Sequence, residues 1–366
     1  MSENEAEKRI IDGSAWHAFC DRLKEVGDVV LDGRNPDGPF DRAEGYRYLT
    51  RLLRAGLEAQ LEFGDPRFPG FYQLSNETIK IGNDNPDNHY LNTTIDGRHD
   101  YVITGNRGTV HYLSFGSKSG GYENTGRMEP TGQIEATEMK FESDGSFVLL
   151  VSNTPKPGNW LPTTPETNQV IVRQTFHDRE TEAVARMKIE RVEAVGTRAL
   201  DPATLEQKLL GSVRFVENTA NIFIDWMGFY AKHINELPSD DQERCQNAGG
   251  DAKIHYFQSY WKLEDDEALV IQPERIPECQ SWNFQLSNYW MESLDYRHHK
   301  ISVNKHTAVA DDDGNVTIVV CAADPGPKYP NWLETTGHKE GGMLFRWIDA
   351  VDHPAIATRV VTLADL

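Results

Sequence analysis

Residues that could move protons gather in one short stretch of the sequence, IGNDNPDNHYLNTT. Its acidic, amide, imidazole and phenol side chains fall within nine positions: Asp84, Asn85, Asp87, Asn88, His89, Tyr90 and Asn92. Carboxylates, imidazoles and phenols donate and accept protons in general acid–base catalysis. The same composition is also typical of an Asx/Pro turn that leads into a strand, because Asp and Asn side chains bond to nearby backbone groups. Both interpretations stay open at the level of the sequence.

The candidates for catalysis are the two carboxylates of this stretch, its imidazole and phenol, and the imidazole of a nearby strand-like run: Asp84, Asp87, His89, Tyr90 and His111. A carboxylate would act as acid or base with a histidine as its proton partner. Tyr90 or Tyr256 would donate a hydrogen bond to an oxyanion. In TVHYLSF, His111 and Tyr112 should point to opposite faces, because side chains alternate along a strand.

A second stretch, SWNFQLSNYWMESLDYRHHK, is rich in aromatic and amide side chains. Such a composition is typical of pockets for apolar or ring-containing small molecules, and it suits the core of a β-sandwich equally well. The residues that we expect to bind substrate come from this stretch and from strand-like runs before it: Asn85, Tyr112, Tyr256, Trp282, Asn288 and Trp290.

Common metal and nucleotide motifs do not occur in the sequence. It contains no HExxH, no GxGxxG, no GxxxxGK[ST] and no GxSxG. The four cysteines are scattered without a CxxC pair, which argues against a disulfide framework and a cysteine-rich zinc site. We therefore expect neither a metal nor a cofactor, although distant histidines could still converge in the fold.

The net charge of −20 bears on the class of partner. A negative field repels nucleic-acid phosphates and anionic membranes, so we expect neither as a partner. No apolar run approaches the ~18 residues of a membrane span, and the N-terminal MSENEAEKRIIDG is polar and acidic. We expect a cytoplasmic protein that acts on a small-molecule substrate or ligand, and a homo-oligomer is compatible with the sequence.

The elements that must position these residues alternate between helical and strand-rich parts of the chain. We expect a helical segment, a β repeat, a helical connector with a linker, and a second β repeat, over residues 1–70, 71–200, 201–250 and 251–366. In the connector, nine apolar residues from Leu205 to Ile234 step by three or four, which predicts one buried helix face. Turn-rich composition predicts a long loop over 118–133 and an exposed linker over 237–251.

The two strand-rich parts match each other. NWLPTT and NWLETT each follow an Asp-Gly turn, an apolar run and a Pro/Gly loop, and each precedes a strand-like run with an arginine, Arg173 or Arg346. So long a repeat indicates a duplicated domain. We therefore predict a β-rich α+β fold, a tandem duplication of a β-sandwich or jelly-roll-like unit with helices before each copy. Trp160 and Trp332 would then be equivalent corners of the two copies.

The chain also resembles a known bacterial family, the domain of unknown function 1214. The resemblance rests on AEGYRYLTRLLRAGLE, GNDNPDNHY, GNRGTVHYLSF and the Asp-Gly to Asn-Trp-Leu sequence that ends in a strand arginine. It covers nearly the whole chain. The second copy departs from the family pattern with Glu334 in place of Pro and with Arg346-Trp347 in place of Arg-x-Tyr. The resemblance implies a β-rich fold with helical additions and no settled reaction.

Three function classes remain after these exclusions. The first is a cofactor-independent enzyme acting on a small, largely apolar or ring-containing substrate, of the lyase (hydro-lyase) or isomerase type, which works by proton transfer. The alternative is a non-catalytic protein that binds a small molecule or carbohydrate between aromatic rings. A carbohydrate-active enzyme would need two carboxyl groups facing each other across a cleft.

Overall fold

A computed structural model describes residues 3–124 and 126–366 of the protein. This part of the chain forms two compact units. The first comprises the chain up to Ile79, Asn88–Asn221 and Asn247–Gly249, and the second comprises Lys80–Asp87, Ile222–Gln246 and Gly250–Leu366. The second unit therefore includes the residues directly before Asn88, where the strands of the first unit begin. The first unit includes three residues shortly before Ile254, where the strands of the second begin.

The first unit contains two four-stranded sheets, with the strand orders β1-β7-β3-β4 and β6-β5-β2-β8. The strands of the first sheet are β1 (Asn88–Thr94), β7 (Thr167–Thr175), β3 (Tyr112–Gly121) and β4 (Arg127–Glu135). Those of the second sheet are β6 (Asn159–Pro162), β5 (Ser146–Ser152), β2 (Tyr101–Asn106) and β8 (Arg186–Arg191).

The second unit repeats this arrangement, with the strand orders β9-β15-β11-β12 and β14-β13-β10-β16. Its first sheet is formed by β9 (Ile254–Lys262), β15 (Glu340–Ala350), β11 (Cys279–Leu286) and β12 (Ser302–Asn304). Its second sheet is formed by β14 (Trp332–Glu334), β13 (Ile318–Cys321), β10 (Glu267–Pro273) and β16 (Ile356–Thr362). Strand by strand the order is the same in both units, and the short NWL strand is parallel to its neighbour in each. The predicted tandem duplication is confirmed.

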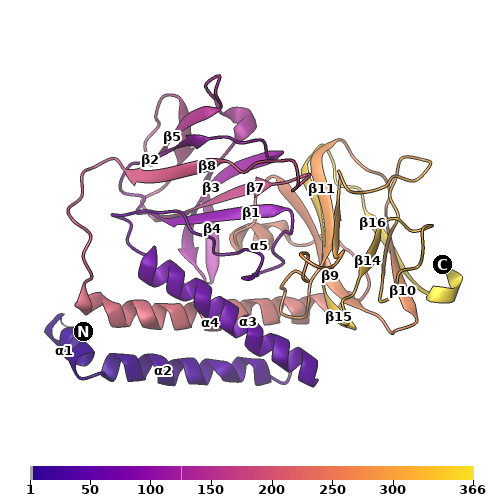
Figure 1. Cartoon of the computed structure of the whole chain (residues 1–366), viewed down its shortest axis with the longest axis horizontal. Helices are drawn as coiled ribbons and strands as arrows, with labels where there is room; N and C mark the ends of the chain where they lie inside the picture. Colours follow the sequence, from indigo (N-terminus) through magenta and orange to yellow (C-terminus); the bar gives the residue numbers. More distant parts are fainter. Residues whose placement is uncertain (1–2, 125) are drawn as a thin grey trace. The chain divides into compact units, whose positions relative to one another are not determined.

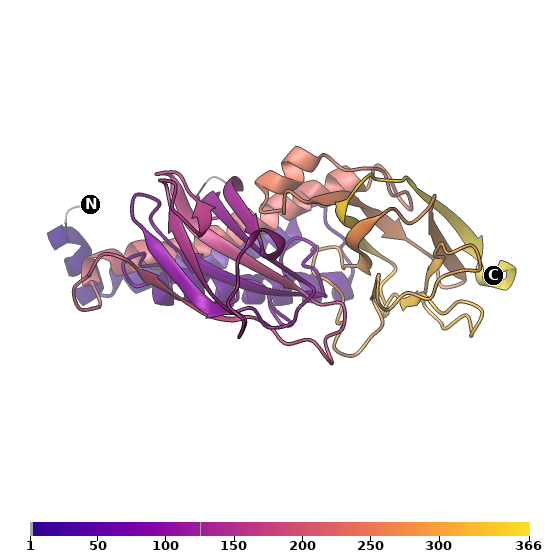
Figure 2. The same ribbon diagram turned by 90° about the horizontal axis from the view of Figure 1, so that it is seen from above.

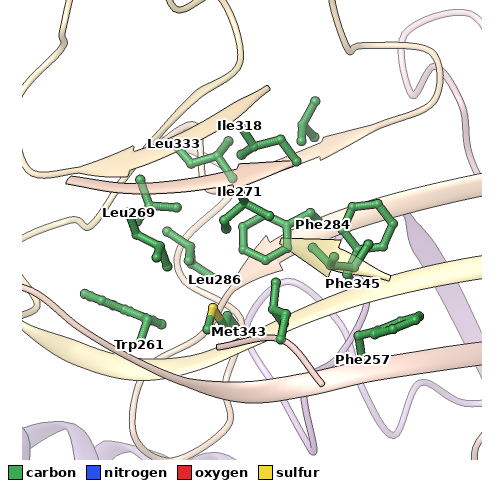
Figure 3. Close-up of a cluster of buried hydrophobic side chains, with 14 of the residues drawn as sticks. Phe257, Trp261, Leu269, Ile271, Phe284, Leu286, Ile318, Leu333, Met343 and Phe345 are labelled. Carbon is green, nitrogen blue, oxygen red and sulfur yellow. The ribbon is translucent and has the colours of Figure 1, made fainter. Parts of the chain in front are cut away.

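Each unit has its hydrophobic core between its two sheets. In the second unit, Phe284 and Phe345 of one sheet lie close to Ile318 and Leu333 of the other, as Figure 3 shows. Side chains along these strands alternate between the core and the outer face. A β-rich sandwich follows from this alternation, as the apolar runs predict.

The helices are α1 (Glu3–Ile11), α2 (Ser14–Val26), α3 (Pro39–Leu57), α4 (Pro202–Tyr230) and α5 (Gln242–Asn247). Short 3-10 turns occupy Gly27–Leu31 (η1), Ala136–Glu138 (η3) and Leu363–Asp365 (η4), and α3 continues into a π-helical turn, η2 (Glu58–Glu62). In the first unit, α1, α2 and α3 lie along one side of the sheets (Figure 1), and Figure 2 shows α2 and α3 behind the strands. No helix within the described residues is long and apolar enough to cross a bilayer.

The two NWL motifs have the same structural role. The Asn331 side chain donates to the carbonyl oxygens of Val309 (2.8 Å) and Thr317 (3.1 Å) and accepts from the Val309 amide (2.8 Å). Asn159 makes three equivalent bonds in the first unit. The indole N–H of Trp332 donates to the backbone of β13 at 3.1 Å, as Trp160 does to β5 at 3.0 Å. The motif thus ties the parallel strand to its neighbour.

Three expectations about local structure are wrong. The expected loop at 118–133 is a hairpin, because β3 runs on to Gly121 and pairs with β4 from Arg127. The expected exposed linker at 237–251 contains α5 and bridges to β9 and β16, so that Leu237 is buried. The helix of the connector ends at Tyr230, and Ile234 beyond it is 45% exposed. In the first two cases backbone pairing overrides turn-rich composition.

The asparagine of the second NWL motif allows a test of this role. We expect Asn331→Ala to lower the free energy of unfolding by about 2–3 kcal/mol, because it leaves buried backbone groups without partners. Asn331 is 1% exposed, whereas Asn159 is only partly buried, so Asn159→Ala should cost less. Urea unfolding of the two variants measures both values. Equal stability of Asn331→Ala and the wild type would contradict the assignment.

Candidate functional site

The structure divides the predicted proton-transfer stretch between the two units. Asp84 and Asp87 belong to the segment Lys80–Asp87 of the second unit, whereas His89 and Tyr90 lie on β1 of the first. Asp84 is 5% exposed. Its carboxylate accepts hydrogen bonds from the backbone amide (2.9 Å) and the hydroxyl (2.8 Å) of Ser293. Burial raises the pKa of Asp84, and the charge of Lys80 opposes that rise.

A buried lysine, Lys80, also binds the backbone around Ser293. Lys80 is 2% exposed, and its ammonium group donates to the carbonyl oxygens of Ser293 (2.6 Å) and Leu294 (2.8 Å) and to the Ser293 hydroxyl (2.9 Å). The Tyr296 ring lies 4.5 Å from the same group. A buried charge with this many partners is typical of a structural role.

The rest of the segment is fixed by amides and by a strand arginine. The Asn85 side-chain oxygen accepts from the Asp87 amide (3.0 Å) and from the Asn283 side chain (2.7 Å), so the predicted Asx turn is present. Arg346, 4% exposed, donates to the Asn83 carbonyl (2.5 Å) and to the Gln285 side chain (2.5 Å).

The first unit has an equivalent anchor. Arg173 donates to the carbonyl oxygen of Gly249. Gly249 lies six residues before His255 of the second repeat, as Asn83 lies six before His89 of the first. Both Gly249 and Asn83 have a positive φ, of 100° and 56°. A loop with a positive-φ residue whose carbonyl oxygen binds a strand arginine is therefore common to the two repeats.

The buried carboxylate of Asp84 is present in the first copy and has no counterpart in the second. The position that corresponds to it in the second copy is Gly250. The Asx turn is not unique to the first copy, because the Asp251 side chain accepts from the Lys253 amide at 3.0 Å.

The candidates of the first unit lie at separate positions on its first sheet or, for His111, just before β3. His89 Nδ1 lies 3.2 Å from the Gln73 amide, and burial lowers the pKa of His89. Tyr90 is opposite Arg173 in the β1–β7 register. The His111 ring stacks on the His177 ring with centroids 3.6 Å apart, and Tyr112 is 1% exposed at the start of β3.

The remaining substrate-binding candidates lie in the second unit. Trp282 belongs to the hydrophobic core and stacks on Phe345 with ring centroids 5.5 Å apart. The Asn288 side chain accepts from the Trp290 amide at 3.0 Å, and Trp290 is 1% exposed. The Tyr256 hydroxyl accepts from the Asp251 amide at 3.0 Å.

A small cavity in the first unit brings together groups suited to acid–base chemistry. Its volume is about 120 Å³. Apolar and polar side chains share the lining, which consists of Ala59, Gln60, Gly64, Tyr72, Leu74, Thr94, Gly120, Gly121, Tyr122, Glu123, Met128, Asn168, Gln169 and Phe215. None of the eleven side chains predicted from the sequence is among them. Gln60 comes from the π-helical turn η2, an element often found at functional sites.

Glu123 is the ionisable carboxyl group of this lining. Burial raises its pKa above the ordinary 4.5, against the opposing effects of a hydrogen bond from Gln60 and of the Arg214 charge. Gly121 makes room for it: a Cβ there would lie 2.6 Å from both carboxylate oxygens. The Asn168 side chain donates to the Gly120 carbonyl at 2.6 Å and so fixes the strand end beside it.

Tyr72 contributes a phenol to the same cavity. Its backbone pairs with Asn92 of β1 through N–H to oxygen bonds of 3.0 and 2.8 Å, and its ring stacks on Phe63. Burial and the charge of Glu123 raise its pKa strongly, so the hydroxyl keeps its proton. A partly buried carboxyl group beside a protonated phenol can exchange a proton with a small molecule and donate a hydrogen bond to it.

Two wider grooves carry less convergent chemistry. One, of about 530 Å³ in the first unit, is lined by Arg67, Arg198 and Lys208 together with acidic side chains. The other, of about 680 Å³ in the second unit, contains His255, whose Nε2 lies 2.9 Å from the Ser239 hydroxyl. Burial lowers the pKa of His255 to about 4, which makes it a weak base. Within the described residues, no group of three or more His, Cys, Asp or Glu side chains could hold a metal ion.

The sequence contained a weak sign of the Glu123 cavity. Two consecutive glycines, Gly120 and Gly121, stand just before Glu123 in KSGGYEN, within a stretch interpreted as a loop. Isolated or paired glycines in a strand mark close approach of other groups. The partners of Glu123, above all Gln60 and Tyr72, lie about fifty or more residues away along the chain.

The fold and site define a duplicated β-sandwich protein with a small acidic cavity in its first repeat. The family described as "Protein of unknown function (DUF1214)" matches twice, over residues 91–176 and 264–351. The chain belongs to this family, as the resemblance implied.

Two solved structures share the fold. An uncharacterized protein from Burkholderia cenocepacia is 49% identical, with a TM-score of 0.96 over 98% of this chain and 100% of that one. The VPA0106 protein from Vibrio parahaemolyticus is 10% identical, with a TM-score of 0.50 over 92% of this chain and 100% of that one. No protein of curated function is detectably similar in sequence.

The buried lysine yields a prediction about stability. We expect Lys80→Met to lower the free energy of unfolding by about 3–5 kcal/mol, because it leaves buried carbonyl oxygens without a donor and removes the positive charge that acts on the buried carboxylate of Asp84. As a control, Lys339→Met removes an exposed ion pair with Glu264 and should cost about 1 kcal/mol or less. Chemical denaturation measures both. A Lys80→Met variant as stable as the Lys339→Met control would refute the structural role.

The raised pKa of Glu123 predicts a pH dependence of stability. The folded state binds this proton more tightly than the unfolded state, so its contribution is complete below pH 4.5 and declines as pH rises through the folded-state pKa. Glu123→Gln cannot titrate, so its stability relative to the wild type should increase over that range. Thermal melts between pH 4 and 8 measure the difference. Glu129→Gln changes an exposed residue of β4 and is the control. The same pH profile in both variants would contradict the prediction.

Proposed function

We propose that the protein is a cofactor-independent proton-transfer enzyme, a hydro-lyase or an isomerase, that acts on a small and largely apolar substrate in the Glu123 cavity. The observation that carries the proposal is the placement of a partly buried carboxyl group and a partly buried phenol in the lining of one cavity. Enzymes obtain general acids and bases by raising carboxyl pKa values through burial. Glu123 fits that pattern.

The size of the cavity limits the substrate. Its 120 Å³ is slightly less than the ~150 Å³ cavity that accommodates benzene. A substrate of about four to six non-hydrogen atoms fits such a volume. Phe215, Leu74 and Met128 would contact its apolar part. A large ring-containing substrate is therefore disfavoured within the class expected from the sequence.

The roles of the lining residues follow from their chemistry. The Glu123 carboxylate would remove a proton from the carbon next to a carbonyl group, while the Tyr72 hydroxyl donates to the oxygen on which negative charge develops. In a hydro-lyase, the carboxylic acid so formed would return its proton to a departing hydroxyl group, which gives water and a carbon–carbon double bond. In an isomerase, the proton would return to another carbon. Gln60 would orient the carboxyl group throughout.

The free cysteines and the net charge support a proposal for the compartment and the class of partner. We place the activity in the cytoplasm with a small molecule as partner, and without nucleic acid or membrane. The thiols of Cys20, Cys245, Cys279 and Cys321 are free, as is usual in reducing compartments. The net charge of −20 disfavours polyanionic partners.

Proton exchange tests the proposal without knowledge of the net reaction. The protein is incubated in D2O with a panel of carbonyl compounds of up to about six non-hydrogen atoms, and loss of the α-proton signal is followed by proton NMR. We expect catalysed exchange for at least one compound, reduced about 100-fold or more in Glu123→Gln, because the variant lacks the base. Glu129→Gln should behave as the wild type.

The alternative function, a non-catalytic binding protein, has its own outcome in the same experiment. Line broadening or saturation transfer on a compound, without exchange of its α-protons in the wild type, would favour binding and overturn catalysis. Exchange that persists undiminished in Glu123→Gln would also overturn the assignment of the base.

A further inference from the structure

The strand arginines of the two repeats, Arg173 and Arg346, make the same backbone contact but face different side chains. In each, Nη2 donates to a backbone carbonyl oxygen in the loop before a first strand. Nη1 of Arg346 donates to the side-chain oxygens of Gln285 at 2.5 Å and Asn283 at 3.3 Å. In the second repeat, two amide side chains of β11 therefore supply the acceptors for this nitrogen.

The strand register identifies the residues that replace these amides in the first repeat. The arginine lies opposite Asn283 in the second repeat and opposite Ser114 in the first. Two residues further along the same strands, Gln285 corresponds to Gly116. The first repeat therefore has a hydroxyl group and a bare glycine where the second has two amides.

Gly116 leaves space beside Arg173. Apart from its chain neighbours, a Cβ at Gly116 would have the Cε of Lys118 as its nearest atom, at 3.8 Å, and Nη1 of Arg173 at 4.0 Å. Glycine in the interior of a strand often marks a place where a ligand approaches the backbone. Arg173 and Lys118 keep 7% and 3% of their surface exposed. The position that the Gln285 side chain fills in the second repeat therefore has room for a small group in the first.

The charges around this space favour an anion. Lys118 and Arg173 bring two positive charges to it. Glu135 brings one negative charge to the same face of the sheet, because it lies opposite Ser114 in the β3–β4 pairing. These three charged residues are at most 7% exposed, and buried charges are stable when opposite charges balance them. A ligand with a single negative charge would balance the positive charge that is in excess among the three.

We propose that the first sheet of the first unit binds a small monocarboxylate over Gly116. The carboxylate oxygens accept hydrogen bonds from Nη1 of Arg173 and from the ammonium group of Lys118, which are common partners of carboxylates. One of these oxygens takes the place of the Gln285 side-chain oxygen of the second repeat. None of these residues lines the Glu123 cavity, so this site is a second one, and its ligand does not depend on the proposed function.

Acetate and acetamide test the requirement for charge, because they have nearly the same size. Dissociation constants come from ligand-observed NMR on the full chain at constant ionic strength. We expect acetate to bind at least about tenfold more tightly than acetamide, because only acetate balances the buried positive charge. Equal binding of the two compounds, or no binding of acetate, would overturn the proposal.

A glutamine in the first repeat tests the location of the site. Gly116→Gln introduces the residue that the second repeat has at this position, and its side chain would occupy the space and supply an acceptor to Arg173. We expect acetate binding to weaken about tenfold or more. Gly196→Gln is the matched control, because Gly196 is exposed and a Cβ there would meet no atom within 4 Å. Undiminished acetate binding in Gly116→Gln, or an equal loss in the control, would overturn the location.

A lysine pair decides the question independently if Gly116→Gln does not fold. Lys118→Met removes one of the two positive charges, and we expect it to weaken acetate binding about tenfold. Lys188→Met removes an exposed lysine of β8 that pairs with Glu190, and it should bind acetate as the wild type does. Thermal melts verify that the variants fold. Unchanged binding in Lys118→Met, or an equal loss in Lys188→Met, would refute the role of Lys118.

Discussion

A buried arginine bound to a backbone carbonyl is the interaction on which the arrangement of each unit depends. Arg346 on β15 and Arg173 on β7 are 4% and 7% exposed. Each donates to the carbonyl oxygen of a residue with positive φ, Asn83 or Gly249, in the segment that leads into a first strand. A guanidinium cannot lose its charge in a protein, so it must find acceptors where it is buried. The segment that supplies them thereby becomes part of the unit.

This constraint accounts for the density of polar groups around residues 80–87. Once Arg346 holds Asn83, the following carboxylate of Asp84 is buried too, and it takes the amide and hydroxyl of Ser293 as donors. Lys80 then donates hydrogen bonds to the carbonyl oxygens of Ser293 and Leu294. A sequence rich in Asp, Asn and Lys is expected at such a place, because buried polar groups need complete hydrogen bonding.

The surroundings of the Glu123 cavity differ, because the side-chain oxygen of one lining residue, Asn168, has no hydrogen-bond donor among the described residues. The cavity lies where β3 ends in two glycines, beside the π-helical turn that extends α3. There the absence of a Cβ at Gly121 leaves space for the Glu123 carboxyl group, and the shielded side-chain oxygen of Asn168 accepts no hydrogen bond from the described residues. Unsatisfied buried groups carry a cost in stability and are therefore concentrated at functional sites.

The sequence by itself determined the β-rich fold, its duplication and the helix of the connector, because apolar periodicity and the two NWL motifs depend on local patterns. It also indicated the Asx turn at Asn85, whose hydrogen bond spans two residues. Only the tertiary structure decided which segment completes which unit and which acidic residue lines a cavity. Asn83 meets Arg346 across 263 positions, and Glu123 meets Gln60 and Tyr72 from a hairpin whose composition is that of a loop. Contacts at such separations depend on the packing of whole sheets and helices, so no short pattern of residues encodes them.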